Sequence, residues 1–184
     1  MEFHTVEEIF AALDKTRRKL VGSTANLSVE QAAFRPAPEK WSVALLIEHL
    51  ALTEERLVGL ATRLLEKAEA ENVKSDGTVT PPVSFREIGE KAQGLKLEAP
   101  DVIKPTGTTS LAESLARLEQ SRAQLQALRP RFEKIDLSNA RFPHPVFGAM
   151  NLYYWLAFIG LHELRHLAQI SDVLTALPKN QAAC

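Results

Sequence analysis

Residues 152–177 read LYYWLAFIGLHELRHLAQISDVLTAL, and this stretch decides the fold class. Apolar side chains dominate it until Pro178, and Asn151 directly before it is a good N-cap. His162 and His166 interrupt the apolar run with a spacing of four, which stacks their side chains one helical turn apart. The stretch therefore predicts a long, mostly buried helix with two imidazoles on one face.

Three earlier segments place apolar residues every three or four positions, as the buried faces of helices require. Each follows a residue that caps helices well, namely Thr5, Ser42 and Ser110. The predicted helices cover residues 6–25, residues 43–69, and a segment from 111 to 132 that Pro130 ends or bends. A short turn after Ser28, a possible helix at residues 85–92 and a loop at 141–151 complete the elements.

These elements predict an all-α four-helix bundle with one long crossover between its second and third helices. The crossover, residues 72–109, is rich in Pro, Gly, Thr and Lys. Neither flank is expected to bury a core of its own, so residues 1–184 are predicted to form a single domain. No stretch alternates with a period of two for long enough to indicate a sheet.

Composition and charge argue against several classes of protein. The chain has 22 Lys and Arg against 23 Asp and Glu, so no basic excess is available to bind nucleic acid or an anionic membrane. The start, MEFHTVEEIF, lacks the pattern of an export signal, and no window has the apolar length of a membrane span. A cytoplasmic location is therefore expected. Cys184 is the last residue and is interpreted as an incidental thiol.

The motif HELRH, residues 162–166, has more than one interpretation. It matches the H-E-x-x-H of zinc peptidases, but the longer pattern needs Gly and His where this chain has Gln169 and Asp172. Asp172 would then have to serve as an oxygen ligand. A di-iron carboxylate site would need a second Glu-x-x-His, which is missing. Spacing alone also allows two satisfied polar residues in a seam of the bundle.

Two distant stretches resemble the signature regions of the DinB-like superfamily, in particular of its YfiT-like branch. They are FRPAPEKWSVALLIEHL at residues 34–50 and HPVFGAMNLYYWLAFIGLHELRHLAQI at residues 144–170. The resemblance covers essentially the whole chain, with residues 70–108 matching only in general character. It implies a four-helix bundle in which His49, His162 and His166 hold one divalent metal ion and leave coordination positions open.

The chemistry of this ligand set agrees with the resemblance. Three neutral imidazoles suit zinc, nickel, iron or cobalt, and three protein ligands leave the vacancy that is typical of a catalytic site. The resemblance also implies metal-dependent transferases, and related isomerases, that use a low-molecular-weight thiol such as bacillithiol or mycothiol. We therefore predict a thiol S-transferase, in which the ion binds the small thiol as thiolate and directs it at an electrophile.

Two alternatives to this function stay open. The first is a hydrolase that uses metal-bound hydroxide, with Glu163 as proton shuttle. The second is a metal-containing helical module without enzymatic activity, which acts through protein contacts such as a homodimer interface. Turnover with thiol, turnover without thiol and no turnover distinguish the three hypotheses.

Three further residues are candidates for supporting roles, each in competition with a simple surface role. Glu163 could also orient an imidazole. Arg56 follows the histidine of the second helix by seven residues, so it returns to the same face and could hold a substrate carboxylate. Gln169 matches the family's usual Gln near this point and could support a metal ligand. The other aromatic candidates are Trp41 and Trp155, expected to pack the bundle, and His144, expected in a turn near the entrance.

Overall fold

Side-chain caps begin the long helices, as the sequence indicates. The computed structural model describes residues 2–84, 86, 90 and 98–178. Thr5 and Ser110 each form a capping box with the glutamate three residues later, and Ser42 and Asn151 cap through their side-chain oxygens. The helices that follow are α1 (Val6–Thr24), α3 (Val43–Glu71), α5 (Leu111–Phe132) and α6 (Leu152–Thr175).

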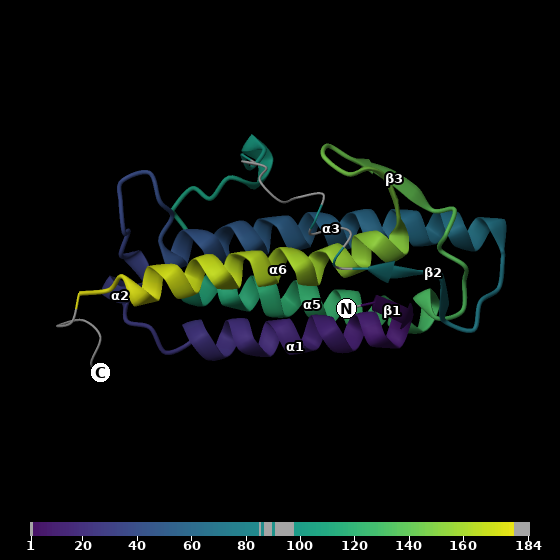
Figure 1. Ribbon diagram of the computed structural model, residues 1–184, viewed down its shortest axis with the longest axis horizontal. Helices are drawn as coiled ribbons and strands as arrows, with labels where there is room; N and C mark the ends of the chain where they lie inside the picture. The colour runs from purple at the N-terminus through teal and green to yellow at the C-terminus, as the bar shows by residue number, and fades with distance from the viewer. Residues whose placement is uncertain (1, 85, 87–89, 91–97, 179–184) are drawn as a thin grey trace.

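These four helices lie side by side as a four-helix bundle, which confirms the predicted fold class (Figure 1). Helix α3 packs against both α5 and α6, while α1 packs mainly against α6. Fully buried side chains such as Phe10, Leu65, Leu125 and Tyr153 fill the space between them. Each large apolar side chain buried in this way contributes roughly 1.5–3 kcal/mol. No helix among the described residues combines the length and the apolar character that crossing a membrane requires.

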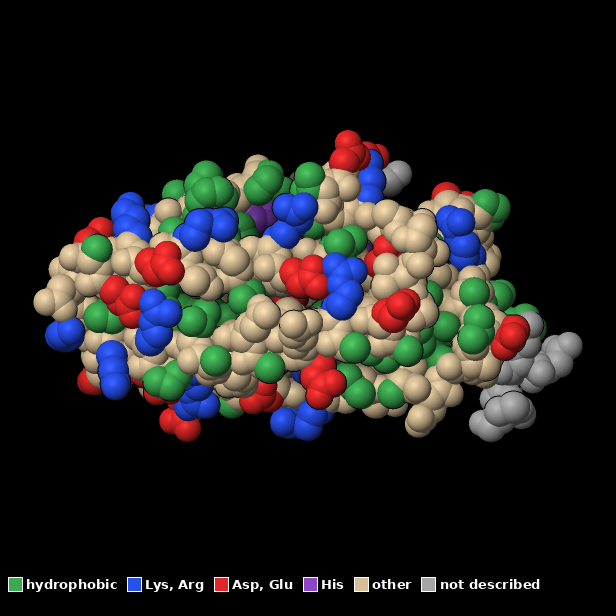
Figure 2. Space-filling model, turned by 180° about the vertical axis from the view of Figure 1, so that it is seen from behind, with side chains coloured by type: hydrophobic (Ala, Val, Ile, Leu, Met, Phe, Trp, Pro, Cys, Tyr) green, Lys and Arg blue, Asp and Glu red, His purple; other side chains and the backbone are tan. Residues whose placement is uncertain are grey.

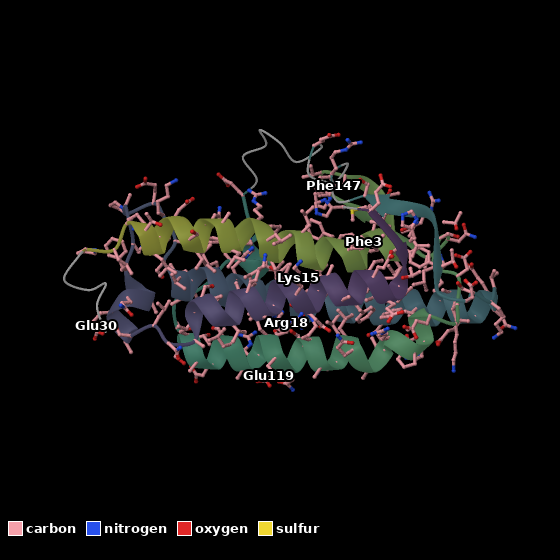
Figure 3. The ribbon with its side chains drawn as sticks, turned by 60° about the horizontal axis from the view of Figure 1, so that its bottom comes forward. Phe3, Lys15, Arg18, Glu30, Glu119 and Phe147 are labelled. Carbon is pink, nitrogen blue, oxygen red and sulfur yellow. The ribbon has the colours of Figure 1, made fainter. Side chains whose placement is uncertain are left out.

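Charged side chains cover the outside of the bundle. Figure 3 shows Lys15 and Arg18 on the exposed side of α1 and Glu119 on the exposed side of α5. Figure 2 shows side chains of both signs scattered over the opposite view of the molecule, without a large field of one sign. This distribution agrees with the near balance of charges in the sequence.

Two short antiparallel strand pairs lie outside the helices, and neither pair was expected from the sequence. Strand β1 (Glu2–Thr5) pairs with β2 (Thr78–Ser84), which places Phe3 opposite Val83. Strands β3 (Arg141–His144) and β4 (Gly148–Asn151) form a hairpin where a loop was expected. Strands β1, β3 and β4 have only four residues each, and the longer β2 contains Pro81 and Pro82, which argue against a strand in a sequence.

The connection from α3 to α5 is the predicted long crossover. It runs through β2 and then through the short 3-10 helix η1 (Asp101–Ile103), which lies above α3 in Figure 1 and contacts it. The helix expected at residues 85–92 lies almost wholly outside the described residues. The short helix α2 (Val29–Ala33) follows the Ser28 cap as predicted, and α5 continues through Pro130 to end at Phe132.

Candidate metal centre

Three histidine side chains from two helices meet at one point. His49 comes from α3, and His162 and His166 come from the face of α6 that packs against α3. The Nε2 atom of His162 lies 3.3 Å from Nε2 of His49 and 3.0 Å from Nε2 of His166. Each residue offers a ligand atom within 4.8 Å of the other two. The structure thus brings together all three residues that the sequence analysis proposed as metal ligands.

Hydrogen bonds on the outer side of two imidazoles determine which nitrogen faces this point. The Nδ1 atom of His49 lies 2.8 Å from the backbone carbonyl oxygen of Ile103. A carbonyl oxygen only accepts, so Nδ1 carries the proton and the lone pair of Nε2 is free to bind a metal. In the same way, Nδ1 of His166 lies 2.7 Å from Oε1 of Gln169. Metal-binding histidines usually have an outer hydrogen bond of this kind.

The two nitrogen separations around His162 are close to those of a tetrahedral metal ion, while the ligand atoms of all three histidines lie within 4.8 Å of one another. Zinc–nitrogen bonds of about 2.0–2.1 Å place two tetrahedral ligands about 3.3–3.4 Å apart. The Nε2 atom of His162 lies 3.3 Å from that of His49 and 3.0 Å from that of His166. Without a cation, Nε2 of His162 carries at most one proton. It can then donate a good hydrogen bond to only one of the two neighbouring Nε2 atoms. A divalent ion would satisfy all three lone pairs, so the residues present fit the ion that the sequence implies.

Burial keeps the three imidazoles neutral. His49 and His166 are buried, and His162 is half-buried. Burial lowers the pKa of His49, and lowers that of His162 well below its ordinary value. Burial, together with the repulsion that a second proton on nearby His49 would cause, lowers the pKa of His166 to about 3. Neutral imidazole is the form that binds metal, so these ligands need to release no proton near neutral pH.

Aromatic rings surround the three histidines. The ring of Trp41 lies 5.0 Å from that of His49, and the ring of Phe158 stacks on His162 with a centroid distance of 5.7 Å. His144, on the β3–β4 hairpin, contacts the ring of Phe158, which in turn stacks on His162. Trp155 is buried, as its expected role in packing requires. Trp41, for which the same role was expected, lies against His49 of the candidate centre.

The carboxylate of Glu163 is engaged elsewhere in the bundle, so its hydrogen bonds do not support the role of proton shuttle, which stays a prediction. One residue along a helix corresponds to a turn of about 100 degrees, so Glu163 points away from the face of His162. Its carboxylate accepts hydrogen bonds from Oγ1 of Thr16 at 2.9 Å and from Nε of Arg17 at 2.6 Å. The residue is only 1% exposed. Both carboxylate oxygens are therefore engaged in the interior of the bundle.

The carboxylate of Glu163 belongs to a cluster of four buried charges, one from each long helix. This core charge cluster consists of Arg17, Glu54, Arg122 and Glu163. Arg17 pairs with both glutamates, and Arg122 lies 3.1 Å from Glu54 and 3.4 Å from Glu163. Burial raises the pKa of Glu54, against the opposing effect of the two arginines. No local sequence pattern indicates this cluster, because its members lie on four separate segments.

The other predicted supporting residues differ in where they lie. Gln169 contacts His166, although the residue is exposed, so the structure groups it with the candidate ligands. Arg56 is exposed on α3, about two helical turns after His49. Its proposed contact with a substrate carboxylate stays a prediction. Asp172, the oxygen ligand of the peptidase interpretation, is exposed on α6.

A segment of the crossover that no sequence pattern indicates lies over His49. Glu48, which is 2% exposed, accepts hydrogen bonds from N and Oγ1 of Thr106 and from N of Gly107. Although burial acts in the opposite direction, these hydrogen bonds hold the pKa of the Glu48 carboxyl below its usual range. A glutamate on a buried helix face indicates that a partner exists. Nothing local indicates that this partner lies 58 residues away along the chain.

Comparisons with known proteins agree with this geometry. The family model of the DinB superfamily matches residues 12–170. The uncharacterized protein YuaE of Bacillus subtilis (strain 168) is 29% identical over 154 residues, which cover 80% of this chain and 85% of YuaE.

Two solved structures share the fold. One is TT2238, a four-helix bundle protein, with a TM-score of 0.59 and 22% identity over 91% of this chain and 99% of that chain. The other is YfiT from Bacillus subtilis, reported as a probable metal-dependent hydrolase with an unusual four-helix bundle topology. It has a TM-score of 0.56 and 18% identity over 92% of this chain and 86% of that chain.

Proposed function

This chain belongs to the DinB superfamily, and from that membership and its three-histidine centre we propose that it is a metal-dependent thiol S-transferase. The observation that carries the proposal is the meeting of three Nε2 atoms from two helices. Three neutral nitrogen ligands suit zinc, nickel, iron or cobalt and leave a coordination position open to a small molecule.

Some residues of the chain would bind the ion, and others hold those ligands in position. His49, His162 and His166 would bind the ion, while the Ile103 carbonyl and the Gln169 side chain keep two of the rings in the metal-binding tautomer. A divalent ion bound there supplies a Lewis acid that ionises a thiol near neutral pH without help from a strong base.

The proposed reaction joins the sulfur of a low-molecular-weight thiol, such as bacillithiol or mycothiol, to an electrophilic carbon. The thiol proton passes to solvent, the sulfur–carbon bond forms, and the bond between that carbon and its leaving group breaks with its electron pair. The position of Glu163 supports a thiol over water as the nucleophile. Its carboxylate is committed to the core charge cluster, so the chain does not offer it as a base beside the histidines.

A hydrolase is the second candidate function, and the likeness to YfiT favours it. That protein is reported as a probable metal-dependent hydrolase, and the two chains share a fold. Activation of water by the same ion would suit this chemistry. In this chain, however, the hydrogen bonds of Glu163 do not support it as the group that takes the proton.

Metal analysis followed by a screen of nucleophiles tests the proposal. The freshly purified protein is analysed for zinc, nickel, iron and cobalt, and the loaded protein is then mixed with chlorodinitrobenzene and bacillithiol, mycothiol, cysteine or glutathione. We expect consumption of thiol that depends on both the protein and the metal. Hydrolysis of nitrophenyl acetate without thiol would favour the hydrolase. Metal binding without either reaction would favour a module without enzymatic activity.

A further inference from the structure

We propose that Glu48 is a positioning residue of the metal centre, which anchors residues 101–108 so that the Ile103 carbonyl holds His49 in its metal-binding orientation. We call residues 101–108 the strap. The inference rests on the proposed function, because it takes His49 as a metal ligand. It adds a residue and a segment of the crossover that neither the histidine spacing nor the family resemblance indicates.

The anchor is a set of three hydrogen bonds to one carboxylate. Oε1 of Glu48 accepts from N of Thr106 at 3.0 Å and from Oγ1 of Thr106 at 2.8 Å, and Oε2 accepts from N of Gly107 at 2.9 Å. Hydrogen bonds to an ionised acceptor are roughly twice as strong as neutral ones. A carboxylate that is 2% exposed also requires such partners, because a buried charge without them is strongly unfavourable. The strap is therefore firmly attached at this point.

The strap reaches His49 through a turn that precedes the anchor. Within η1, the amide of Ile103 donates to the carbonyl of Pro100 at 3.0 Å, and the amide of Lys104 donates to the carbonyl of Asp101 at 3.2 Å. This turn leaves the Ile103 carbonyl directed at Nδ1 of His49, 2.8 Å away. The strap thus contacts two consecutive residues of α3, one that holds it and one that it orients.

Gly107 gives the strap a backbone conformation that favours glycine. Its φ of +75° lies in the left-handed region, which residues with a Cβ rarely adopt. A Cβ at this position would make only an ordinary van der Waals contact, 3.5 Å from Cδ2 of Leu45 on α3, so it is the φ of Gly107 that restricts the residue here. A residue other than glycine here would strain the strap without removing any charge from the site.

Glu48 has a clear matched control on the same helix. Glu55 follows it by seven residues, and so lies near the same face of α3, but its carboxylate is 39% exposed and forms a bidentate pair with Arg117. Replacing either glutamate by glutamine removes one negative charge from α3. The exchange at Glu48 also replaces an acceptor oxygen with an amide group that faces backbone donors. Comparison of the two variants therefore separates the loss of charge from the loss of the anchor.

The experiment measures zinc affinity by competition with a chromophoric chelator, and the absorption of the cobalt-loaded protein as a report on ligand geometry. We expect Glu48→Gln and Glu48→Ala to lower zinc affinity by about 10 to 100-fold, as loss of an outer hydrogen bond to a ligand does, and to change the cobalt spectrum. Glu55→Gln should leave both unchanged. Gly107→Ala should lower affinity in the same direction as Glu48→Ala, although it alters no charge. Circular dichroism checks that all variants keep their helices.

A double-mutant cycle with His49 tests whether Glu48 acts through that ligand. Because positioning has no effect once the positioned ring is gone, Glu48→Ala should not lower zinc affinity further in a His49→Ala background. Equal losses in both backgrounds would overturn the inference, as would a Glu48→Ala protein that binds zinc as tightly as its parent. A parent protein that binds no metal would instead contradict the proposed function itself, so the two failures are distinguishable.

Discussion

His49 is the residue whose role depends most on the fold, because the helix that carries it supplies no second ligand nearby. A lone histidine in an apolar helix is often only a satisfied core residue. Here its Nε2 atom lies 3.3 Å from that of His162. We predict that His49→Ala lowers metal affinity by much more than the roughly 10 to 100-fold typical of an outer partner, while helix content stays unchanged.

Zinc titration against a competing chelator, with circular dichroism in parallel, measures both effects of this replacement. Activity should fall together with metal affinity. A His49→Ala protein that binds zinc as tightly as its parent would contradict the two-helix centre. The peptidase interpretation, with Asp172 as the extra ligand, would then regain support.

Gln169 provides a second test at the scale of single residues. Its Oε1 atom accepts from Nδ1 of His166 at 2.7 Å, so Gln169→Leu removes the acceptor that favours the metal-binding tautomer. We expect zinc affinity to fall by about 10 to 100-fold, and Gln169→Glu to restore it because a carboxylate oxygen accepts the same hydrogen bond. The matched control is Gln126→Leu, since Gln126 pairs with Asp14 instead. Equal affinity of Gln169→Leu and the parent would contradict the role.

The site residues were open to prediction from sequence to different degrees. The spacing of His162 and His166 indicates a shared face of one helix, whereas His49 enters only through the family resemblance. Glu163 adjoins His162 in sequence, but its carboxylate contacts Thr16 and Arg17 of α1 and Arg122 of α5. The sequence alone does not show which side of α6 faces which neighbour. Glu48 has no local signal for its partners, because its hydrogen bonds depend on how the crossover returns.

At the scale of the helices, the core charge cluster joins all four of them. Glu54 and Glu55 are neighbours on α3 that make a natural comparison, since their carboxylates are 3% and 39% exposed. We predict that Glu54→Ala destabilises the protein by about 3–5 kcal/mol, because it leaves Arg17 and Arg122 buried without this partner. Glu55→Ala breaks an exposed pair with Arg117 and should cost about 1 kcal/mol or less.

Urea unfolding of the chelator-treated proteins, followed by circular dichroism, measures this difference without a contribution from bound metal. Similar stability of the Glu54→Ala protein and its parent would show that the cluster does not hold the helices together. The replacement of both Glu54 and Arg122 by apolar residues of similar volume provides a further comparison. This double replacement should lower the free energy of unfolding less than the loss of one partner alone, because fewer unpaired charges remain in the core.

The helices and the strands differ in how far the sequence predicts them. The helices begin at residues such as Thr5, Ser42 and Ser110, whose capping hydrogen bonds connect positions only a few residues apart. Strand β1, by contrast, pairs with β2 across most of the first half of the chain. No local pattern specifies that pairing, and the same reason explains why the strap was not predicted. The sequence therefore predicts features that depend on neighbouring residues, such as helix caps. The pairing of β1 with β2 and the contacts of the strap are seen only in the structure.

At the scale of the whole molecule, the metal centre and the core are largely separate. The bundle buries two clusters of apolar side chains, and Phe10, Leu65 and Leu125 belong to the larger of them. We therefore predict that removal of metal with a chelator leaves the protein folded at neutral pH. Bound ion should raise the free energy of unfolding by about 2.7 kcal/mol when its free concentration is 100 times its dissociation constant.

Thermal unfolding followed by circular dichroism, with chelator and with added zinc, measures this prediction. Helix content at room temperature should be equal in the two samples, and the midpoint should rise with zinc. His49→Ala should reduce the rise, because the increment depends on affinity for the folded state. Loss of the helices on chelation would mean that the ion is a structural staple, as in small zinc domains that are unfolded without metal. The open coordination position would then lose its catalytic interpretation, since structural sites normally take all four ligands from the protein.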